Sequence, residues 1–257
     1  MSDVVIDVEA VGPAWSELDE PIRKYLSKRA ADQLRRDGAE FADETEAEEK
    51  AADRLGLELG LARPIAIGIH MVAKQRSLIL LEDTGDEKVF VREGTTVERG
   101  SETILLERFW ETISDKHVGR IVTFNGRSYD GPLLMTRSAQ LGVTVRRNLV
   151  PYRYDMAQHC DLADALCQQG ATRAYYTLDY WCRVFGIASP KSGGVDGSQV
   201  EKLYREGRMQ KIATYLDDDL RQTAELYVKL AGCGFLKQFK GGPLAHQYSQ
   251  QLMALAG

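Results

Sequence analysis

Two acidic residues, Asp7 and Glu9, stand in a run of apolar and β-branched residues near the amino end of the chain. Residues 4–10 are typical of a strand, and because side chains alternate between the two faces of a strand, Asp7 and Glu9 share one face. Adjacent carboxylates repel each other, and their burial is costly unless protons or a cation offset the charge. An edge strand with one solvated face would explain the pair equally well.

A third acid, Asp219, lies in the middle of the apolar face of a long helix that we predict for residues 208–231. Helical spacing places the apolar side chains on one stripe, namely Ile212, Leu216, Thr223, Leu226, Tyr227 and Leu230. Tyr215 precedes Asp219 by one turn, so its hydroxyl and the carboxylate can share a site. The neighbouring Asp217 and Asp218 are predicted to point towards the polar side and to be solvated.

A fourth acid, Asp130, follows Asn125-Gly126 and stands between a predicted strand at 119–124 and a helix that begins near Pro132. Aspartate is common at helix starts, where its carboxylate accepts hydrogen bonds from backbone N–H groups. Taken alone, Asp130 is therefore more simply interpreted as a capping residue than as a catalytic one.

The binding of divalent metal ions is a sufficient chemical reason for four carboxylates to lie close together. Oxygen ligands without histidine or cysteine suit Mg²⁺ or Mn²⁺ rather than zinc. Two such ions about 4 Å apart can activate a water and stabilise the leaving oxygen of a phosphodiester. We therefore expect Asp7, Glu9, Asp130 and Asp219 to meet in one metal site.

The elements that must position these acids are mainly strands in the first half and helices in the second. We predict strands at 3–10, 64–73, 77–82, 88–92 and 119–124, those at 64–92 forming a meander. Helices are predicted at 101–114, from 132, and at about 159–168, 177–186, 197–206 and 208–231. This order favours an α/β fold with a mixed central sheet flanked by helices.

The whole chain, residues 1–257, is predicted to form a single domain, since no linker suggests a second one. Residues 15–61 are charged and helix-favouring, and we expect them to be an insertion of one or two surface helices after the first strand. Residues 234–257 form a short C-terminal tail.

Composition narrows the classes of function without choosing one. The net charge of −5 weighs against broad non-specific coating of nucleic acid, but it leaves room for an enzyme that holds a few phosphates. We expect no membrane association, because the amino end lacks a secretory pattern and no apolar run is long enough to span a bilayer. The four cysteines show no CxxC or zinc spacing, which favours reduced thiols in a cytoplasmic protein.

Three motifs resemble those of the DEDD superfamily of 3′→5′ exonucleases, in particular stand-alone relatives of the proofreading exonuclease domain of family-B DNA polymerases. Asp7-Val8-Glu9 matches the first family motif, Asp-x-Glu. Residues 125–132 match Asn-Gly-x-x-Phe-Asp-x-Pro with Tyr129 in place of Phe, and residues 215–219 match Tyr-x-x-x-Asp. The tyrosine of the third motif indicates the tyrosine subclass (DEDDy). Ala10 stands where the family often has Thr or Ser.

The resemblance implies a ribonuclease H-like fold and a hydrolase that releases nucleoside 5′-monophosphates from the 3′ end of single-stranded DNA or RNA. It implies two Mg²⁺ or Mn²⁺ ions per active site. Asp7, Glu9 and Asp219 would ligate one ion directly, and Asp7 would bridge to a second ion held by Asp130. Tyr215 would orient the attacking water; since free tyrosine has a pKa near 10, positioning the water is a safer role than deprotonating it.

The same resemblance implies substrate contacts. The backbone from Val8 to Ala10 and the Asn125 side chain are candidates to hold the terminal nucleotide. Tyr129 could stack near a base, or its ring could close the helix against the sheet. One or two members of a scattered basic set could contact phosphates: Arg127, Arg137, Arg146, Arg147, Arg153 and Lys191.

The segment His159-Cys160-Asp161-Leu162 looks like the His-x-Asp-Leu segment of the stand-alone group. We expect His159 to be a structural, hydrogen-bonding histidine. Asp161 is predicted to begin a helix rather than to act as a fifth ligand.

Three other functions remain compatible with the residues. One is a catalytically weak or inactive ribonuclease H-like protein that only binds nucleic acid. Another is an endonuclease or a nucleotide-clearing enzyme, and a third is a proofreading subunit of a separate polymerase or repair partner. The preference for DNA or RNA stays open, because recognition of the 2′-OH depends on a few groups that the fold places.

Overall fold

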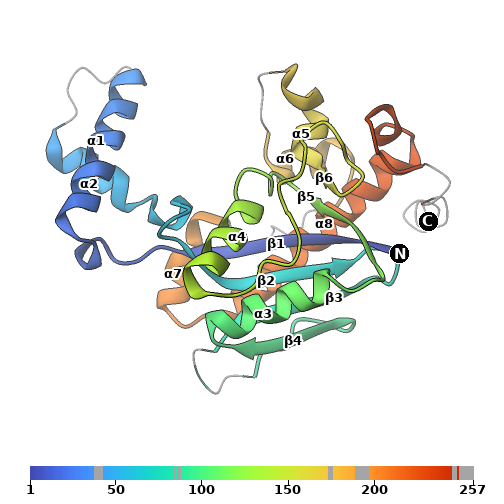
Figure 1. Cartoon of the computed structure of the whole chain (residues 1–257), viewed down its shortest axis with the longest axis horizontal. Helices are drawn as coiled ribbons and strands as arrows, with labels where there is room; N and C mark the ends of the chain where they lie inside the picture. Colours follow the sequence, from blue (N-terminus) through green and yellow to red (C-terminus); the bar gives the residue numbers. More distant parts are fainter. Residues whose placement is uncertain are drawn as a thin grey trace.

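A six-stranded sheet with the strand order β4-β3-β2-β1-β5-β6 forms the centre of the computed structural model (Figure 1). The structure describes residues 1–37, 43–83, 85, 88–172, 176–188, 197–244 and 248, and the statements below refer to these residues. The strands are β1 (Ser2–Val11), β2 (Arg63–Met71), β3 (Arg76–Glu82), β4 (Thr95–Gly100), β5 (Val118–Thr123) and β6 (His159–Asp161). The neighbours β1–β2 and β2–β3 are antiparallel, whereas the other neighbouring pairs are parallel.

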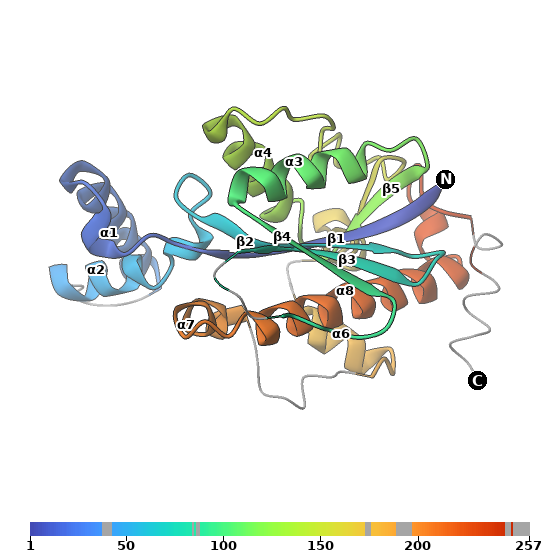
Figure 2. The same cartoon turned by 90° about the horizontal axis from the view of Figure 1, so that it is seen from below.

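Helices cover both faces of this mixed sheet, as Figure 2 shows edge-on. One face packs against α3 (Glu102–Ile113) and α4 (Asp130–Leu141). The opposite face packs against α5 (Leu162–Leu166), α6 (Leu178–Val184), α7 (Val200–Arg205) and α8 (Met209–Gly232). The predicted α/β class and its ribonuclease H-like layering are confirmed.

Strand β1 lies inside the sheet, between β2 and β5, so the edge-strand explanation of its two acids is wrong. Its side chains alternate between two hydrophobic cores. Val4, Ile6 and Val8 face the α3–α4 core, whereas Val5 and Val11 face the α8 core. By the same alternation, Asp7 and Glu9 belong to the face that α8 covers.

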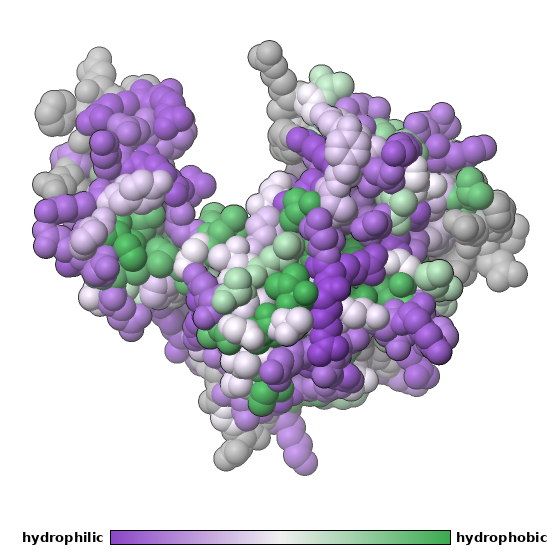
Figure 3. Space-filling model, in the orientation of Figure 1, coloured by the Kyte–Doolittle hydropathy of each residue, from purple (hydrophilic) through white to green (hydrophobic). Residues whose placement is uncertain are grey.

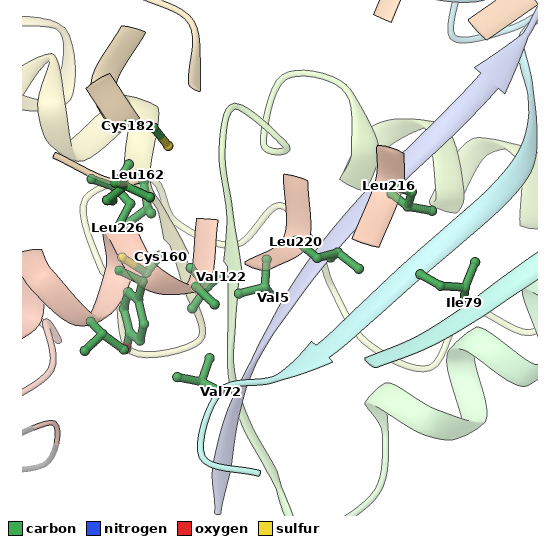
Figure 4. Packing of buried hydrophobic residues seen from close by; sticks show 14 of the residues in the cluster. Val5, Val72, Ile79, Val122, Cys160, Leu162, Cys182, Leu216, Leu220 and Leu226 are labelled. Carbon is green, nitrogen blue, oxygen red and sulfur yellow. The ribbon is translucent and has the colours of Figure 1, made fainter. Parts of the chain in front are cut away.

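Helix α8 lies close against the sheet because Gly68 of β2 leaves room for it. A Cβ atom at Gly68 would come within 2.5 Å of Leu220 Cδ1 and 3.0 Å of Leu216 Cγ. Figure 4 shows these two leucines lying beside strand side chains that include Val5 and Ile79. The apolar stripe predicted for this helix is buried, so the helix presents Asp219 towards the sheet.

Between β1 and β2 the chain forms two helices that pack on each other, α1 (Glu20–Arg36) and α2 (Glu44–Ala52). Short 3₁₀ helices flank them, η1 (Trp15–Glu17) and η2 (Leu55–Leu57). Leu18, Leu26, Ala51 and Leu55 form a small core of their own. This pair projects from the rest of the molecule in Figure 1, and Figure 3 shows the surface hollowed between it and the side that carries α5 and α6.

Two predicted elements differ from the structure. Residues 88–92 are not a strand: the backbone of Phe90 bonds to the side-chain amide of Gln210 instead of to a neighbouring strand. The fourth strand along the chain is β4, and because it runs parallel to β3 the predicted meander is also wrong. The helix expected at 159–168 begins only at Leu162, since residues 159–161 form β6.

The C-terminal part after α8 contains η6 (Leu236–Gln238), and a short 3₁₀ helix, η5 (Gly197–Gln199), precedes α7. The Tyr248 hydroxyl donates a hydrogen bond to Asp3, so the end of the described chain returns to the start of β1. Cys160, Cys167 and Cys182 are buried and Cys233 is exposed. None of the described helices combines the length and the apolar character that a membrane span requires.

Candidate active site

The four predicted acids come from three elements, and their charges act on one another. Asp7 and Glu9 lie on β1, Asp130 is the first residue of α4, and Asp219 lies on α8. Removal from water raises the pKa of Asp7 well above its ordinary value, and the negative charges of the other three acids raise it further. The structure therefore brings together the residues that the sequence predicted to form one site.

The carboxyl groups of Asp7 and Asp130 lie close enough to interact, and this interaction raises the pKa of Asp7 further. Burial also raises the pKa of Asp130, although interactions with its own backbone N–H, with Asp7 and with the backbone N–H of Val8 oppose this. Asp130 is thus tied to β1 as well as to the first turn of its helix.

Tyr215 and Asp219 are joined across one turn of α8, where the tyrosine hydroxyl hydrogen-bonds the carboxylate. Glu9 and Asp219 are only 9% and 8% exposed. Burial raises the pKa of Tyr215, and the charges of Asp219 and Glu9 raise it further. The hydroxyl therefore keeps its proton at neutral pH and acts as a hydrogen-bond donor.

The loop that carries Asp130 is held by Asp161, whose role is larger than the sequence indicated. Its carboxylate accepts hydrogen bonds from the backbone N–H groups of Asn125 and Arg127, both at 2.9 Å. It also caps α5 by accepting from the N–H groups of Ala163 at 3.0 Å and Asp164 at 3.3 Å. The prediction that Asp161 begins a helix is confirmed. Its hydrogen bonds to the backbone of the 125–127 loop were not predicted from the sequence.

Two backbone features give this loop its path. Asn125 adopts a left-handed conformation with φ of 64°, which asparagine tolerates better than most residues. Gly126 lies so close to its surroundings that a Cβ atom there would meet Thr123 Cβ at 2.7 Å and Asp130 Oδ2 at 2.9 Å. The Asn-Gly pair is therefore required for the turn that delivers Asp130.

His159 is a structural residue, as predicted. Its Nε2 lies 2.8 Å from the Thr123 hydroxyl and its Nδ1 lies 2.7 Å from the Leu149 carbonyl oxygen. Burial, with a contribution from the positive charge of Arg127, lowers the pKa of His159 to about 4. The ring is neutral at physiological pH and joins the end of β5 to the segment before β6.

The residues predicted to hold the terminal nucleotide lie around the acids in different settings. The Val8 side chain is buried, and its backbone N–H bonds to Asp130. Ala10 is half-buried beside a register shift in the β1–β2 pairing. Tyr129 packs against the α3–α4 core, and its hydroxyl donates to the Gly56 carbonyl oxygen, which favours the packing role over base stacking.

Three of the predicted phosphate contacts have structural partners. Arg127 donates to the Pro151 carbonyl oxygen at 2.6 Å, Arg137 pairs with Glu102 at 2.7 Å, and Arg147 donates to the Gly119 carbonyl oxygen at 2.6 Å. Arg146 is exposed, and the side chain of Arg153 is 41% exposed while pairing with Asp164. Lys191 lies outside the described residues.

The prediction that Asp217 is solvated is wrong. This residue is fully buried, and its carboxylate bonds to Arg92 and Arg221 at 2.8 Å and to the Thr95 hydroxyl at 3.1 Å. Asp218 is also paired with Arg92, with 18% of its side chain exposed. The i,i+4 spacing of Asp217 and Arg221 was the available sequence signal, but Arg92 and Thr95 come from distant sequence.

The donor set of the acid cluster fits a hard divalent cation in kind and in charge. Its members offer only oxygen atoms, and in the absence of a cation three of them raise the pKa of the fourth, Asp7. Among the described residues no three His, Cys, Asp or Glu side chains already converge on one ion position.

Comparison with known proteins matches residues 57–238 to a family model described as a predicted 3′–5′ exonuclease related to the exonuclease domain of PolB. The matched part includes the Asn125–Pro132 loop, Asp161, Tyr215 and Asp219, while Asp7 and Glu9 precede it. The chain is also similar to an uncharacterized protein of Methanocaldococcus jannaschii. The two are 26% identical over 184 residues, which cover 68% of this chain and 90% of that protein.

Proposed function

This chain belongs to the family of predicted 3′–5′ exonucleases related to the exonuclease domain of PolB, and from that premise we propose that it is a two-metal-ion 3′→5′ exonuclease of the tyrosine (DEDDy) subclass. Its substrate is the 3′ end of single-stranded DNA or RNA, and its products are nucleoside 5′-monophosphates. The observation that carries this proposal is the meeting of Asp7, Glu9, Asp130 and Asp219, in which the charges of the other three acids raise the pKa of Asp7.

Metal binding accounts for that arrangement. Asp7, Glu9 and Asp219 would hold one Mg²⁺ or Mn²⁺ ion, and Asp7 and Asp130 a second. When bound, the ions supply charge neutralisation and activation of water for attack on a phosphodiester. Without them, the like charges of these acids repel one another.

The remaining residues orient the reactants. Tyr215 lies one turn from Asp219 on α8 and its hydroxyl interacts with that carboxylate, so it can align the attacking water. The backbone at Val8–Ala10 and the Asn125 side chain would contact the terminal nucleotide. Asp161 holds the backbone of Asn125.

The test is digestion of single-stranded DNA and RNA oligonucleotides that carry a label at the 5′ end. With Mg²⁺ or Mn²⁺ we expect a ladder that shortens by single nucleotides from the 3′ end, and no reaction in EDTA. Internal fragments would instead identify an endonuclease. Intact oligonucleotides that are nevertheless bound would favour a ribonuclease H-like nucleic-acid-binding protein, and a requirement for added polymerase would favour a proofreading subunit.

A further inference from the structure

Two exposed tyrosines, Tyr152 and Tyr154, stand on a turn that contacts the active-site loop. They are 68% and 47% exposed, high fractions for large aromatic side chains. Their rings meet edge to face, with centroids 5.6 Å apart and planes at 66°. This geometry leaves ring faces open to solvent, unlike that of the exposed Tyr176 and Tyr180, which stack on each other at 4.2 Å and 15°.

The turn that carries the two rings is fixed by the backbone. The Asp155 N–H donates to the Tyr152 carbonyl oxygen at 3.1 Å, which closes a four-residue turn with Arg153 and Tyr154 in its centre. Behind the turn, the Met156 N–H donates to the Lys240 carbonyl oxygen at 2.8 Å. The rings are therefore displayed on a closed turn, which lowers the entropic cost of binding a ligand.

The same turn is joined to the loop that delivers Asp130. The Arg127 guanidinium donates to the Pro151 carbonyl oxygen at 2.6 Å, immediately before the turn. Asp164 connects the two segments again, because its carboxylate pairs with Arg127 at 3.4 Å and with Arg153 at 2.6 Å. Arg127 precedes Asp130 by three residues in the same loop, so the turn is linked to the loop that carries one of the four acids.

Two exposed cations lie beside the rings, and each is also paired with a carboxylate. The side chain of Arg153, between the tyrosines, is 41% exposed. Lys240 is 73% exposed at its side chain and bonds to Asp155 at 2.9 Å. Aromatic faces that accept bases, beside cations that accept phosphates, are the combination by which proteins bind single-stranded nucleic acid.

We propose that Tyr152 and Tyr154, with Arg153 and Lys240, form a stacking site for unpaired bases of the same single strand whose 3′ end enters the acid cluster. This proposal rests on the proposed function for its ligand, and it adds a second contact upstream of the reacting end. The site requires unpaired bases, since ring stacking is possible only on exposed base faces. It therefore makes the chain selective for single strands over duplexes.

The test measures binding separately from hydrolysis. In EDTA, fluorescence anisotropy gives the Kd of the wild-type chain and of the Tyr152→Ala/Tyr154→Ala variant for a labelled single strand of about 12 nucleotides, a length within the range of single-strand grooves. We expect the substitution to raise this Kd about tenfold. Affinity for a dinucleotide, which is too short to reach the turn, should not change.

Two controls separate stacking from general effects. Tyr25→Ala removes a tyrosine that is 64% exposed on α1 and should leave the Kd unchanged. Tyr152→Trp/Tyr154→Trp keeps aromatic faces and should restore binding. Each variant should have the same Tm as the wild type, which would show that the substitutions do not disturb the fold.

Hydrolysis assays with Mn²⁺ on the same samples distinguish the two proposals. If the single strand is digested from its 3′ end but the Tyr152→Ala/Tyr154→Ala variant binds like the wild type, the stacking site is refuted and the exonuclease stands. In that case the exposed tyrosines of the turn would instead be a candidate contact for another protein. If nothing is digested but the substitution still weakens binding, the stacking site stands and the proposed catalytic function fails.

Discussion

The carboxyl groups of Asp7 and Asp130 lie close enough to interact, so the central strand β1 and the first turn of α4 place two acids together. Burial raises the pKa of both groups, and the charge of Asp130 raises that of Asp7 further. A divalent cation that bound these residues would offset their negative charge. Binding of such a cation should therefore stabilise the folded chain.

Replacing Asp217 should damage stability rather than catalysis. In Asp217→Ala, Arg92 and Arg221 lose a fully buried carboxylate that pairs with both. We expect the free energy of unfolding to fall by about 2 to 3 kcal/mol, measured by urea denaturation. The folded fraction should keep the wild-type turnover rate; a loss of turnover without a loss of stability would contradict the structural role.

Replacing Tyr215 should slow turnover without weakening metal binding. Tyr215→Phe removes the hydroxyl that bonds to Asp219 but keeps the ring. We expect kcat on a single-stranded oligonucleotide to fall about tenfold to a hundredfold, as for other groups that orient ligands around a metal. The rise in Tm caused by Mn²⁺ should persist, and its disappearance would mean that the hydroxyl holds the cluster together instead.

Adding a methyl group at Gly126 should misplace Asp130. The new Cβ would lie 2.7 Å from Thr123 Cβ and 2.9 Å from Asp130 Oδ2, so the loop or the carboxylate must move. Gly126→Ala should reduce kcat by about a hundredfold, since displacements near 1 Å have effects of that size. Gly60→Ala, where a Cβ meets nothing within 4 Å, is the matched control and should behave like the wild type.

Acid should destabilise the chain through His159. Burial lowers the pKa of His159 to about 4, below the ordinary value of 6.5, so on acidification the unfolded chain takes up a proton that the folded chain refuses. This contribution is complete above about pH 6.5 and is lost as the pH falls towards 4, by up to about 3 kcal/mol. Urea denaturation across this range should show a smaller pH slope for His159→Gln.

His117, which is exposed, provides the control for that experiment. The slope for His117→Gln should match that of the wild type. Equal slopes for the wild type and His159→Gln would show that the buried ring is not the group that titrates.

The sequence was sufficient to predict three of the four acids because each of these three breaks a local pattern. Asp7 and Glu9 interrupt a β-branched strand, and Asp219 interrupts the apolar stripe of α8, so periodicity alone indicated a site. The same periodicity predicted the central strand and the long helix, whose buried faces match the structure. Asp130 needed the family resemblance, because an aspartate at a helix start has a common structural explanation.

What the sequence did not reveal depends on contacts between distant segments. Asp217 was expected to be solvated because helical spacing describes only its own helix, whereas Arg92 reaches it from the segment before β4. Residues 88–92 were expected to form a strand. Instead, the side-chain amide of Gln210 on α8 hydrogen-bonds the backbone N–H and carbonyl oxygen of Phe90. Asp161 looked like a simple helix start because its bonds to the 125–127 loop cross 34 and 36 residues.

The central claim is that the acid cluster is a metal-dependent nuclease site, and a matched pair of variants on α8 tests it most directly. Asp219→Asn alters an acid of the cluster, whereas Asp218→Asn alters its neighbour, which pairs with Arg92. For each, 3′-end digestion of a 5′-labelled single strand and the change in Tm on adding Mn²⁺ are measured.

We predict that Asp219→Asn loses at least about a hundredfold in rate and loses the Mn²⁺-induced rise in Tm, while remaining folded. Asp218→Asn should keep both properties. Equal digestion by Asp219→Asn and the wild type, or digestion of the wild type's substrate in EDTA, would contradict the account.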